Sequence, residues 1–93
     1  MYAVLIEVDV TGVDPEEGLR ALQEQIVPAI RQLPGFRSGT WLTGNQDGRG
    51  LSLTLWDTDQ HARTMAERFG PGSSPTASAS VVRCEIRDVA ATA

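Results

Sequence analysis

Residues 51–62 read Leu-Ser-Leu-Thr-Leu-Trp-Asp-Thr-Asp-Gln-His-Ala, and they hold the clearest structural signal in this chain of 93 residues. Their first six positions alternate strictly. Leucines occupy one set of alternate positions, and Ser52, Thr54 and Trp56 occupy the other. Because successive side chains of a strand point to opposite faces, this pattern predicts a strand with one leucine face and one mixed face.

The strand leads directly into a predicted helix. Asp57 or Thr58 can accept a hydrogen bond from the first free backbone N–H groups and so cap it. Residues 70–72, Gly-Pro-Gly, end it. Between these points the apolar residues recur at helical spacing, which predicts one buried stripe. The stripe consists of Ala62, Met65, Ala66 and Phe69.

The N-terminal third repeats the strand–helix order. Residues 2–10 alternate and predict a first strand. Asp14 and Pro15 have the residue types of a helix start, and apolar residues at three- and four-residue spacing predict a helix that ends at residues 33–35, Leu-Pro-Gly. Pro28 lies inside this run and cannot donate a helical hydrogen bond, so we expect a kink or a break near residues 25–27.

The remaining segments complete the topology. Residues 36–43 predict a second strand, the glycine-rich residues 44–50 a hairpin loop, and residues 81–89 a fourth strand. The small-residue linker at 73–78 should be the most mobile segment. The order strand, helix, strand, strand, helix, strand predicts a single α+β domain over residues 1–93, with a ferredoxin-like βαββαβ fold and one antiparallel four-stranded sheet.

The strands are apolar on both faces, which predicts a partner. A hairpin centred on residues 46 and 47 places Trp41 near Ser52 and Trp56 near Arg37 on one face. The helices can cover one face only, so the other would expose a large apolar patch. We therefore expect a homodimer with sheet against sheet. The face opposite the two tryptophans collects Phe36, Leu42, Leu51, Leu53 and Leu55.

Composition excludes several classes of function. The chain has eight arginines, no lysine and a net charge of -4, which argues against nucleic-acid and membrane partners and rules out Schiff-base lysine chemistry. One cysteine, Cys84, and one histidine cannot form an ordinary zinc site, so we expect no metal and no cofactor. With no apolar run long enough for a signal peptide or a span, we expect a cytoplasmic protein.

Two motifs carry a resemblance to a known family. They are residues 33–36, Leu-Pro-Gly-Phe, which enter a strand carrying Gly39 and Trp41, and residues 51–57, which end in Trp-Asp before a capped helix. Together they resemble the antibiotic biosynthesis monooxygenase-like group of the dimeric α+β barrel superfamily. The resemblance implies a dimeric α+β barrel. It also implies binding of a planar apolar or phenolic small molecule, and in the enzymes of the group monooxygenation without metal or flavin.

The resemblance also suggests site residues. Trp56 and Trp41 would form an aromatic wall, with the hydroxyls of Ser52 and Thr54 beside them. Met65 stands where the haem-degrading branch has a tryptophan, Val8 stands where it has an asparagine, and its histidine is missing, so haem degradation is not expected. The remaining candidates are catalytic: Arg37 to stabilise an anion and His61 to carry a proton.

A second interpretation stays open. Small domains use aromatic residues for packing first, and this interpretation places Trp41 and Trp56 in the core or at the dimer interface. Cys84 alternates with Val82 and Ile86, which favours a buried small hydrophobe over a nucleophile. On this interpretation the protein is a non-catalytic dimerisation or ligand-binding module.

Overall fold

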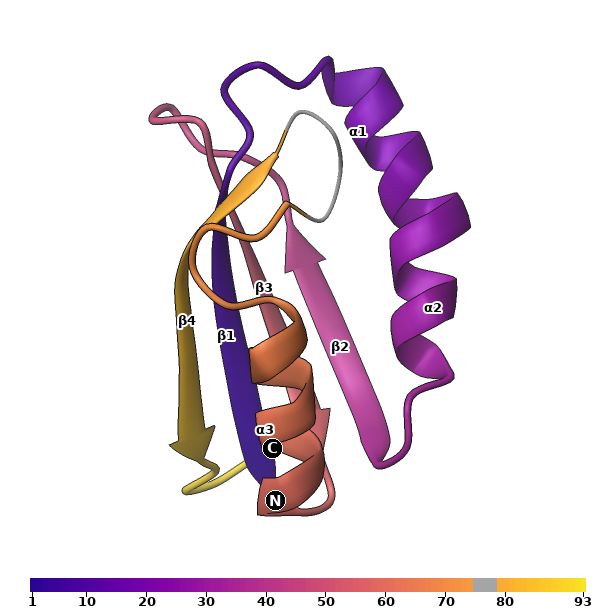
Figure 1. Ribbon diagram of the computed structural model, residues 1–93, viewed down its shortest axis with the longest axis vertical. Helices are drawn as coiled ribbons and strands as arrows, with labels where there is room; N and C mark the ends of the chain where they lie inside the picture. Colours follow the sequence, from indigo (N-terminus) through magenta and orange to yellow (C-terminus); the bar gives the residue numbers. More distant parts are fainter. Residues whose placement is uncertain (75–78) are drawn as a thin grey trace.

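The fold is described by a computed structural model that covers residues 1–74 and 79–93. In these residues three helical segments, α1, α2 and α3, accompany four strands that form one sheet. The first two are joined by a π-helical turn, η1, so that they run as one continuous helix (Figure 1). The elements are β1 (Tyr2–Asp9), α1 (Pro15–Ala21), η1 (Leu22–Ile26), α2 (Val27–Arg31), β2 (Phe36–Leu42), β3 (Arg49–Trp56), α3 (Asp59–Arg68) and β4 (Ser80–Asp88).

The four strands form one antiparallel sheet in the order β2-β3-β1-β4. Side chains of α2 and α3 pack with β1, β3 and β4 in a single core, so both helical layers cover the same face of the sheet (Figure 1). The predicted α+β class and the four-stranded antiparallel sheet are confirmed, and the topology is compatible with a ferredoxin-like fold.

The first helical segment begins and bends as its sequence predicts. The backbone N–H of Glu17 donates to the Asp14 carboxylate at 3.3 Å, and Pro15 occupies the first turn. Pro28 has no N–H to give to the carbonyl of Glu24. The irregularity takes the form of the π-helical turn immediately before it, in which the N–H of Val27 donates to the carbonyl of Leu22. The predicted break is therefore a widened turn that starts about one turn earlier than expected.

The register between β2 and β3 corrects one prediction. Trp41 lies opposite Ser52, as expected, but Trp56 pairs with Phe36 and not with Arg37. A register shift between Phe36 and Ser38 leaves Arg37 as an extra residue in the strand. Since one extra residue reverses the alternation, Phe36 lies on the same helix-covered face as Trp56, and its predicted place on the face opposite the two tryptophans is wrong.

Trp56 anchors the helix layer to the sheet. Its side chain is 1% exposed, and its indole Nε1–H donates to the Thr54 hydroxyl at 2.9 Å. The Phe36 ring meets it edge to face, with ring centroids 5.6 Å apart. Met65 and Ala62 of α3 are fully buried in the same cluster. This end of the interior is therefore filled by large side chains.

The segment after α3 is described in part. The backbone N–H of Ser73 donates to the carbonyl of Gly70, and the backbone N–H of Val81 donates to the carbonyl of Ser73. These bonds connect the start of the predicted linker to β4. The rest of that linker, residues 75–78, lies outside the described residues, so its predicted mobility is not addressed. Within the described part of the chain, no helix is long and apolar enough to cross a membrane.

Substitution of Trp56 tests its role as the anchor. Trp56→Phe removes part of a buried side chain and leaves the Thr54 hydroxyl without its donor, so the free energy of unfolding should fall by about 1–3 kcal/mol. Urea denaturation measures this change. Trp41→Phe is the matched control because Trp41 is only partly buried, and it should cost clearly less. Equal losses for the two variants would contradict the assignment.

Candidate functional site

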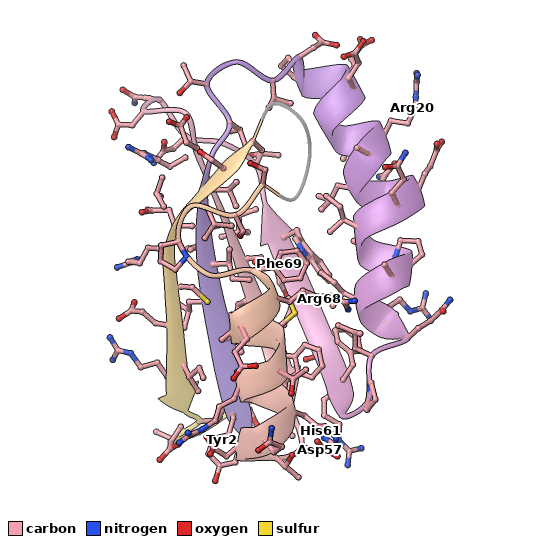
Figure 2. The ribbon with its side chains drawn as sticks, viewed as in Figure 1. Tyr2, Arg20, Asp57, His61, Arg68 and Phe69 are labelled. Atoms are coloured by element: carbon pink, nitrogen blue, oxygen red, sulfur yellow. The ribbon has the colours of Figure 1, made fainter. Side chains whose placement is uncertain are left out.

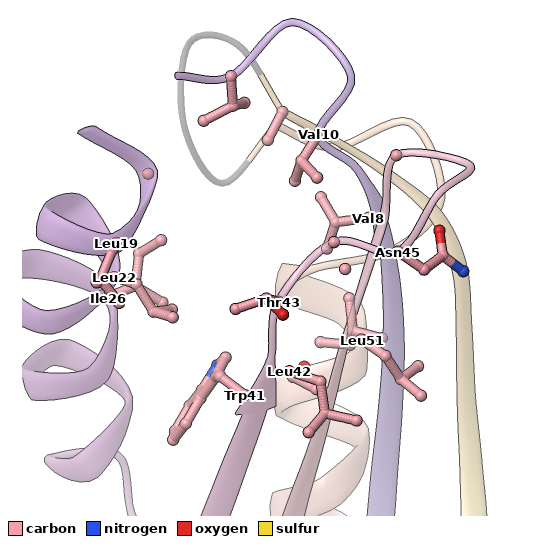
Figure 3. Close-up of a pocket in the computed structure, with 18 of the residues that line it drawn as sticks. Val8, Val10, Leu19, Leu22, Ile26, Trp41, Leu42, Thr43, Asn45 and Leu51 are labelled. Carbon is pink, nitrogen blue, oxygen red and sulfur yellow. The ribbon is translucent and has the colours of Figure 1, made fainter. Parts of the chain in front are cut away.

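A cavity of about 610 Å³ lies between the first helical segment and the sheet, at the end where β1 leaves the sheet and the β2–β3 hairpin turns. One wall is the apolar stripe of α1 and η1. The opposite wall comes from the ends of β1, β2 and β3 (Figure 3). The main apolar lining residues are Val8, Val10, Leu19, Leu22, Ile26, Ile30, Trp41, Met65 and Phe69.

The cavity exists because the side chains on the covered face of the sheet become smaller toward this end. On the covered face of β3 the buried residues run Trp56, Thr54, Ser52 and Gly50, in order of decreasing size. Trp56 fills the gap between sheet and helices at one end, whereas Ser52 and Gly50 cannot fill it at the other. Within the described residues α2 packs against β2, whereas α1 has no comparable contact with a strand. As a result Leu19, on the cavity side of α1, remains 50% exposed.

Trp41 forms the aromatic part of the wall. Its ring lies against the backbone of Gly39, where a Cβ would overlap the indole. Gly39 therefore provides the room in which the ring can lie along β2. In Figure 3 the indole extends from β2 toward Leu22 and Ile26 of the helical segment. The arrangement offers a planar ligand an aromatic surface and an aliphatic surface that face each other.

The polar groups around the cavity are few, and several are already engaged. Ser52 places a hydroxyl on the floor opposite Trp41. At the rim, the Thr11 hydroxyl donates to the Asp9 carboxylate at 2.6 Å, and the Asn45 side-chain oxygen accepts from two backbone N–H groups of its own loop. Among the described lining residues, Asp47 in the hairpin loop has the only ionisable side chain.

The structure brings together three of the seven residues suggested by sequence. Trp41, Ser52 and Met65 all line the cavity. Trp56 and Thr54 lie in the filled part of the core and are bonded to each other, so they support the floor and do not border the cavity.

Arg37 and His61 lie away from the cavity. Arg37 is the exposed extra residue of β2, near the end of the sheet where β3 meets α3. His61 is at that same end, in the first turn of α3 (Figure 2). Neither side chain is within the wall of the cavity, so the structure does not join the two proposed catalytic residues to the proposed ligand wall.

His61 takes part in a different arrangement. Its Nδ1 lies 2.7 Å from a carboxylate oxygen of Asp57, and since an ionised carboxylate can only accept, Nδ1 carries the proton (Figure 2). The pair closes over Gly35, whose φ of 84° and missing Cβ make room for both side chains. The Asp57 backbone N–H also donates to the Gly35 carbonyl at 3.0 Å. The cluster joins the start of α3 to the turn before β2.

Hydrogen bonding lowers the pKa of Asp57, and burial raises the pKa of Cys84. The hydrogen bond from His61 is the main cause that lowers the pKa of Asp57, with a smaller contribution from the Arg37 guanidinium. Burial raises the pKa of the Cys84 thiol, whose sulfur lies 3.9 Å from the Ala66 carbonyl. A thiol held in its neutral form is a poor nucleophile, which agrees with Cys84 as a packing residue.

No group of three or more histidine, cysteine, aspartate or glutamate side chains is placed to hold a metal ion among residues 1–74 and 79–93. The described lining of the cavity offers apolar contact, the aromatic side chains of Trp41 and Phe69, the Asp47 carboxylate and a few hydroxyl and amide groups. Such a lining can bind and orient an apolar molecule.

Sequence reasoning missed most of the cavity wall. Leu22 and Ile26 belong to a stripe predicted to be buried, Val8 was considered only as the counterpart of an asparagine in the haem-degrading branch, and Gly50 was assigned to the hairpin loop. The decreasing side-chain size along one face of β3 is the signal that could have found them. Where the strand below contributes only serine and glycine, the apolar stripe of the helix cannot by itself fill the space between helix and sheet.

Asp57→Asn tests the contribution of the pair to stability. The pKa of Asp57 is lowered in the folded protein, so its carboxylate stabilises the fold above its unfolded pKa of about 4, and this contribution is lost as the pH falls through the lower folded value. The variant should be less stable than the parent at pH 7, and the difference should shrink at about pH 2.5.

Thermal unfolding at the two pH values measures the effect. Glu67→Gln, which removes an exposed carboxylate from the same helix, is the control and should give little difference at either pH. A loss for Asp57→Asn that is the same at both pH values would refute the electrostatic explanation.

Comparisons of the chain with protein-family models, with curated proteins and with solved structures find no match. The resemblance to the monooxygenase-like group therefore depends on the motifs quoted above, and the function has to be argued from the cavity itself.

Proposed function

We propose that this chain is a small dimeric α+β barrel protein that binds a planar apolar or phenolic molecule in the cavity between α1–η1 and the sheet. The observation that carries the proposal is the cavity of about 610 Å³, which has an aromatic ring, Trp41, on one side and the aliphatic stripe of Leu22 and Ile26 on the other. Its volume lies within the range of ligand pockets for small organic molecules.

The lining favours binding over acid–base chemistry by protein groups. Asp47 is the one ionisable side chain among the described lining residues, and it belongs to an exposed hairpin loop. His61 is held by Asp57 at the other end of the sheet. A general acid or base has to reach the proton that it transfers, which excludes His61 and leaves Asp47 as the one candidate among the described lining residues.

Cofactor-independent monooxygenation is the reaction that such a lining supports best. In that chemistry the anion of the phenolic substrate itself supplies the electrons to O₂. One oxygen atom becomes a carbonyl on a ring carbon, so that the ring is oxidised to a quinone. The other leaves as water, which takes up the phenolic proton and the hydrogen lost from that carbon. The protein needs to position the ring and exclude water, and an apolar cavity with Ser52 on its floor is suited to both tasks.

The open face of the sheet supports the dimer. Its leucines form a patch over β2 and β3, in which Leu42 is 57% and Leu53 42% exposed. At one side the patch is bordered by a charged row on β4, where Arg83 and Arg87 pair with Glu85. A second copy of the same surface would bury the leucines and leave the charged row at the rim. The patch, which extends onto β1, consists of Leu5, Leu42, Leu51, Leu53 and Leu55, of which Leu42 and Leu51 also border the cavity.

Tryptophan fluorescence tests ligand binding. A panel of naphthols and quinones should quench the emission of Trp41 in a saturable way, because Trp41 lines the cavity and Trp56 does not. Trp56→Phe should keep the quenching and Trp41→Phe should lose it. Quenching that does not saturate, or that persists in Trp41→Phe, would contradict binding at this place.

Gly50→Val provides the matched test of the cavity. A Cβ at Gly50 meets only ordinary contacts, the nearest at 3.6 Å, so the variant should fold while its side chain fills part of the floor. Affinity should fall by about fivefold or more, with no loss of stability. Unchanged affinity would place the ligand elsewhere.

The dimer is tested by Leu53→Glu. A charge in the centre of the leucine patch should convert a dimer to a monomer, as measured by sedimentation at micromolar concentration. Gln23→Glu adds the same charge on the exposed side of η1 and should leave the mass unchanged. A monomeric parent protein, or a Leu53→Glu variant that remains dimeric, would rule out this interface.

A further inference from the structure

A second cavity of about 250 Å³ lies between the first helical segment and α3. Its walls are mostly apolar and come from η1, α2 and α3. It shares Ile26, Ile30 and Phe69 with the larger cavity, so the two are neighbours along the same layer of side chains. A molecule bound against Ile26 in the larger cavity therefore has this second space next to it.

Two side chains with hydrogen-bond donors are among the residues that line the smaller cavity. Arg68, in the last turn of α3, supplies a guanidinium group, and Gln25 of η1 supplies a side-chain amide. The other lining residues are apolar: Ile26, Ala29, Ile30, Leu33 and Phe69. Figure 2 shows Arg68 and Phe69 midway along the molecule, distant from the His61–Asp57 pair.

The two arginines Arg63 and Arg68 of α3 differ in their ion-pair partners. Arg63, on the same helix, is bound to Asp59 at 2.7 Å. Within the part of the chain that the structure describes, Arg68 has no such carboxylate within 4.0 Å. The guanidinium at the cavity is therefore available to an anion from outside the chain.

We infer that the ligand is an acid: a planar apolar body that carries a carboxylate or a group of the same charge, with its anionic end at Arg68 and Gln25. This inference rests on the proposed function, because the body of the ligand occupies the larger cavity. A guanidinium holds a carboxylate through two parallel N–H donors, and an amide N–H adds a third.

The consequence for specificity is a preference for anions in a protein whose own net charge is -4. The overall field repels an anion, so the preference must come from the local donors. A neutral molecule of the same shape gains the apolar contacts but leaves Arg68 and Gln25 to water. The protein should therefore bind an acid more tightly than the corresponding neutral amide, because of the charge of Arg68.

Isothermal titration with 2-naphthoate and with the neutral 2-naphthamide tests the inference at pH 8. The parent protein should bind the acid about fivefold more tightly than the amide. Arg68→Gln should remove this preference and leave the affinity for the amide unchanged. Arg68→Lys should keep part of it, because the charge remains but the paired donors do not. Arg63→Gln, with the same change of charge on the same helix, should keep the preference in full.

The outcomes separate this inference from the proposed function. Equal binding of acid and amide by the parent protein would overturn the anion site and leave the apolar site in place. A preference that survives Arg68→Gln would also overturn it, since another group would then hold the charge. Binding of neither compound up to millimolar concentration would overturn both the inference and the proposed function.

Discussion

Along the covered face of β3 the side chains shrink from Trp56 through Thr54 and Ser52 to Gly50, and the interior of the molecule follows that order. Helices packed on a sheet leave a layer that side chains must fill. At the Trp56 end the layer is filled, with Phe36 and the fully buried Met65 beside the indole. At the Gly50 end the strand contributes almost nothing, and the helix above it stands clear of the floor.

This division gives the two ends of the sheet different roles. The end with Trp56 also carries the His61–Asp57 pair, which closes over Gly35 and fastens α3 to the turn before β2. It holds the fold together. The other end has the cavity and few groups that can transfer a proton. A reaction in the cavity would have to depend on the chemistry of its substrate, and for this reason we propose oxygenation by the substrate's own anion.

Alternation and capping predicted the elements well, because both are local. The order of strands and helices, the Asp14 cap and the disturbance before Pro28 all depend on residues close together in sequence. The faces of β2 were harder to predict, since the extra residue Arg37 reverses the alternation and no local signal marks it.

The site was predicted only in part, and the reason is physical. Trp41, Ser52 and Trp56 share a face of the sheet. Alternation predicts the face on which a side chain lies, but it does not predict how deeply that side chain is buried. Whether a residue borders a cavity or lies in the core depends on what packs above it, which is a property of the assembled layers. Hence Trp41 lines the cavity while Trp56 supports the core, although the sequence offered the same two interpretations, ligand wall or packing, for both. His61 was predicted from its chemistry alone, and its partner Asp57 holds it elsewhere.

The central claim is that the gap above Ser52 and Gly50 is a binding site and not a space that the helix can close. The most direct measurement is a crystal structure of the protein grown with 2-naphthol. We predict density for the ring between Trp41 and the side chains of Leu22 and Ile26, with α1 in the position described here. An empty structure in which α1 lies on the sheet and Leu19 and Leu22 fill the space would contradict the account.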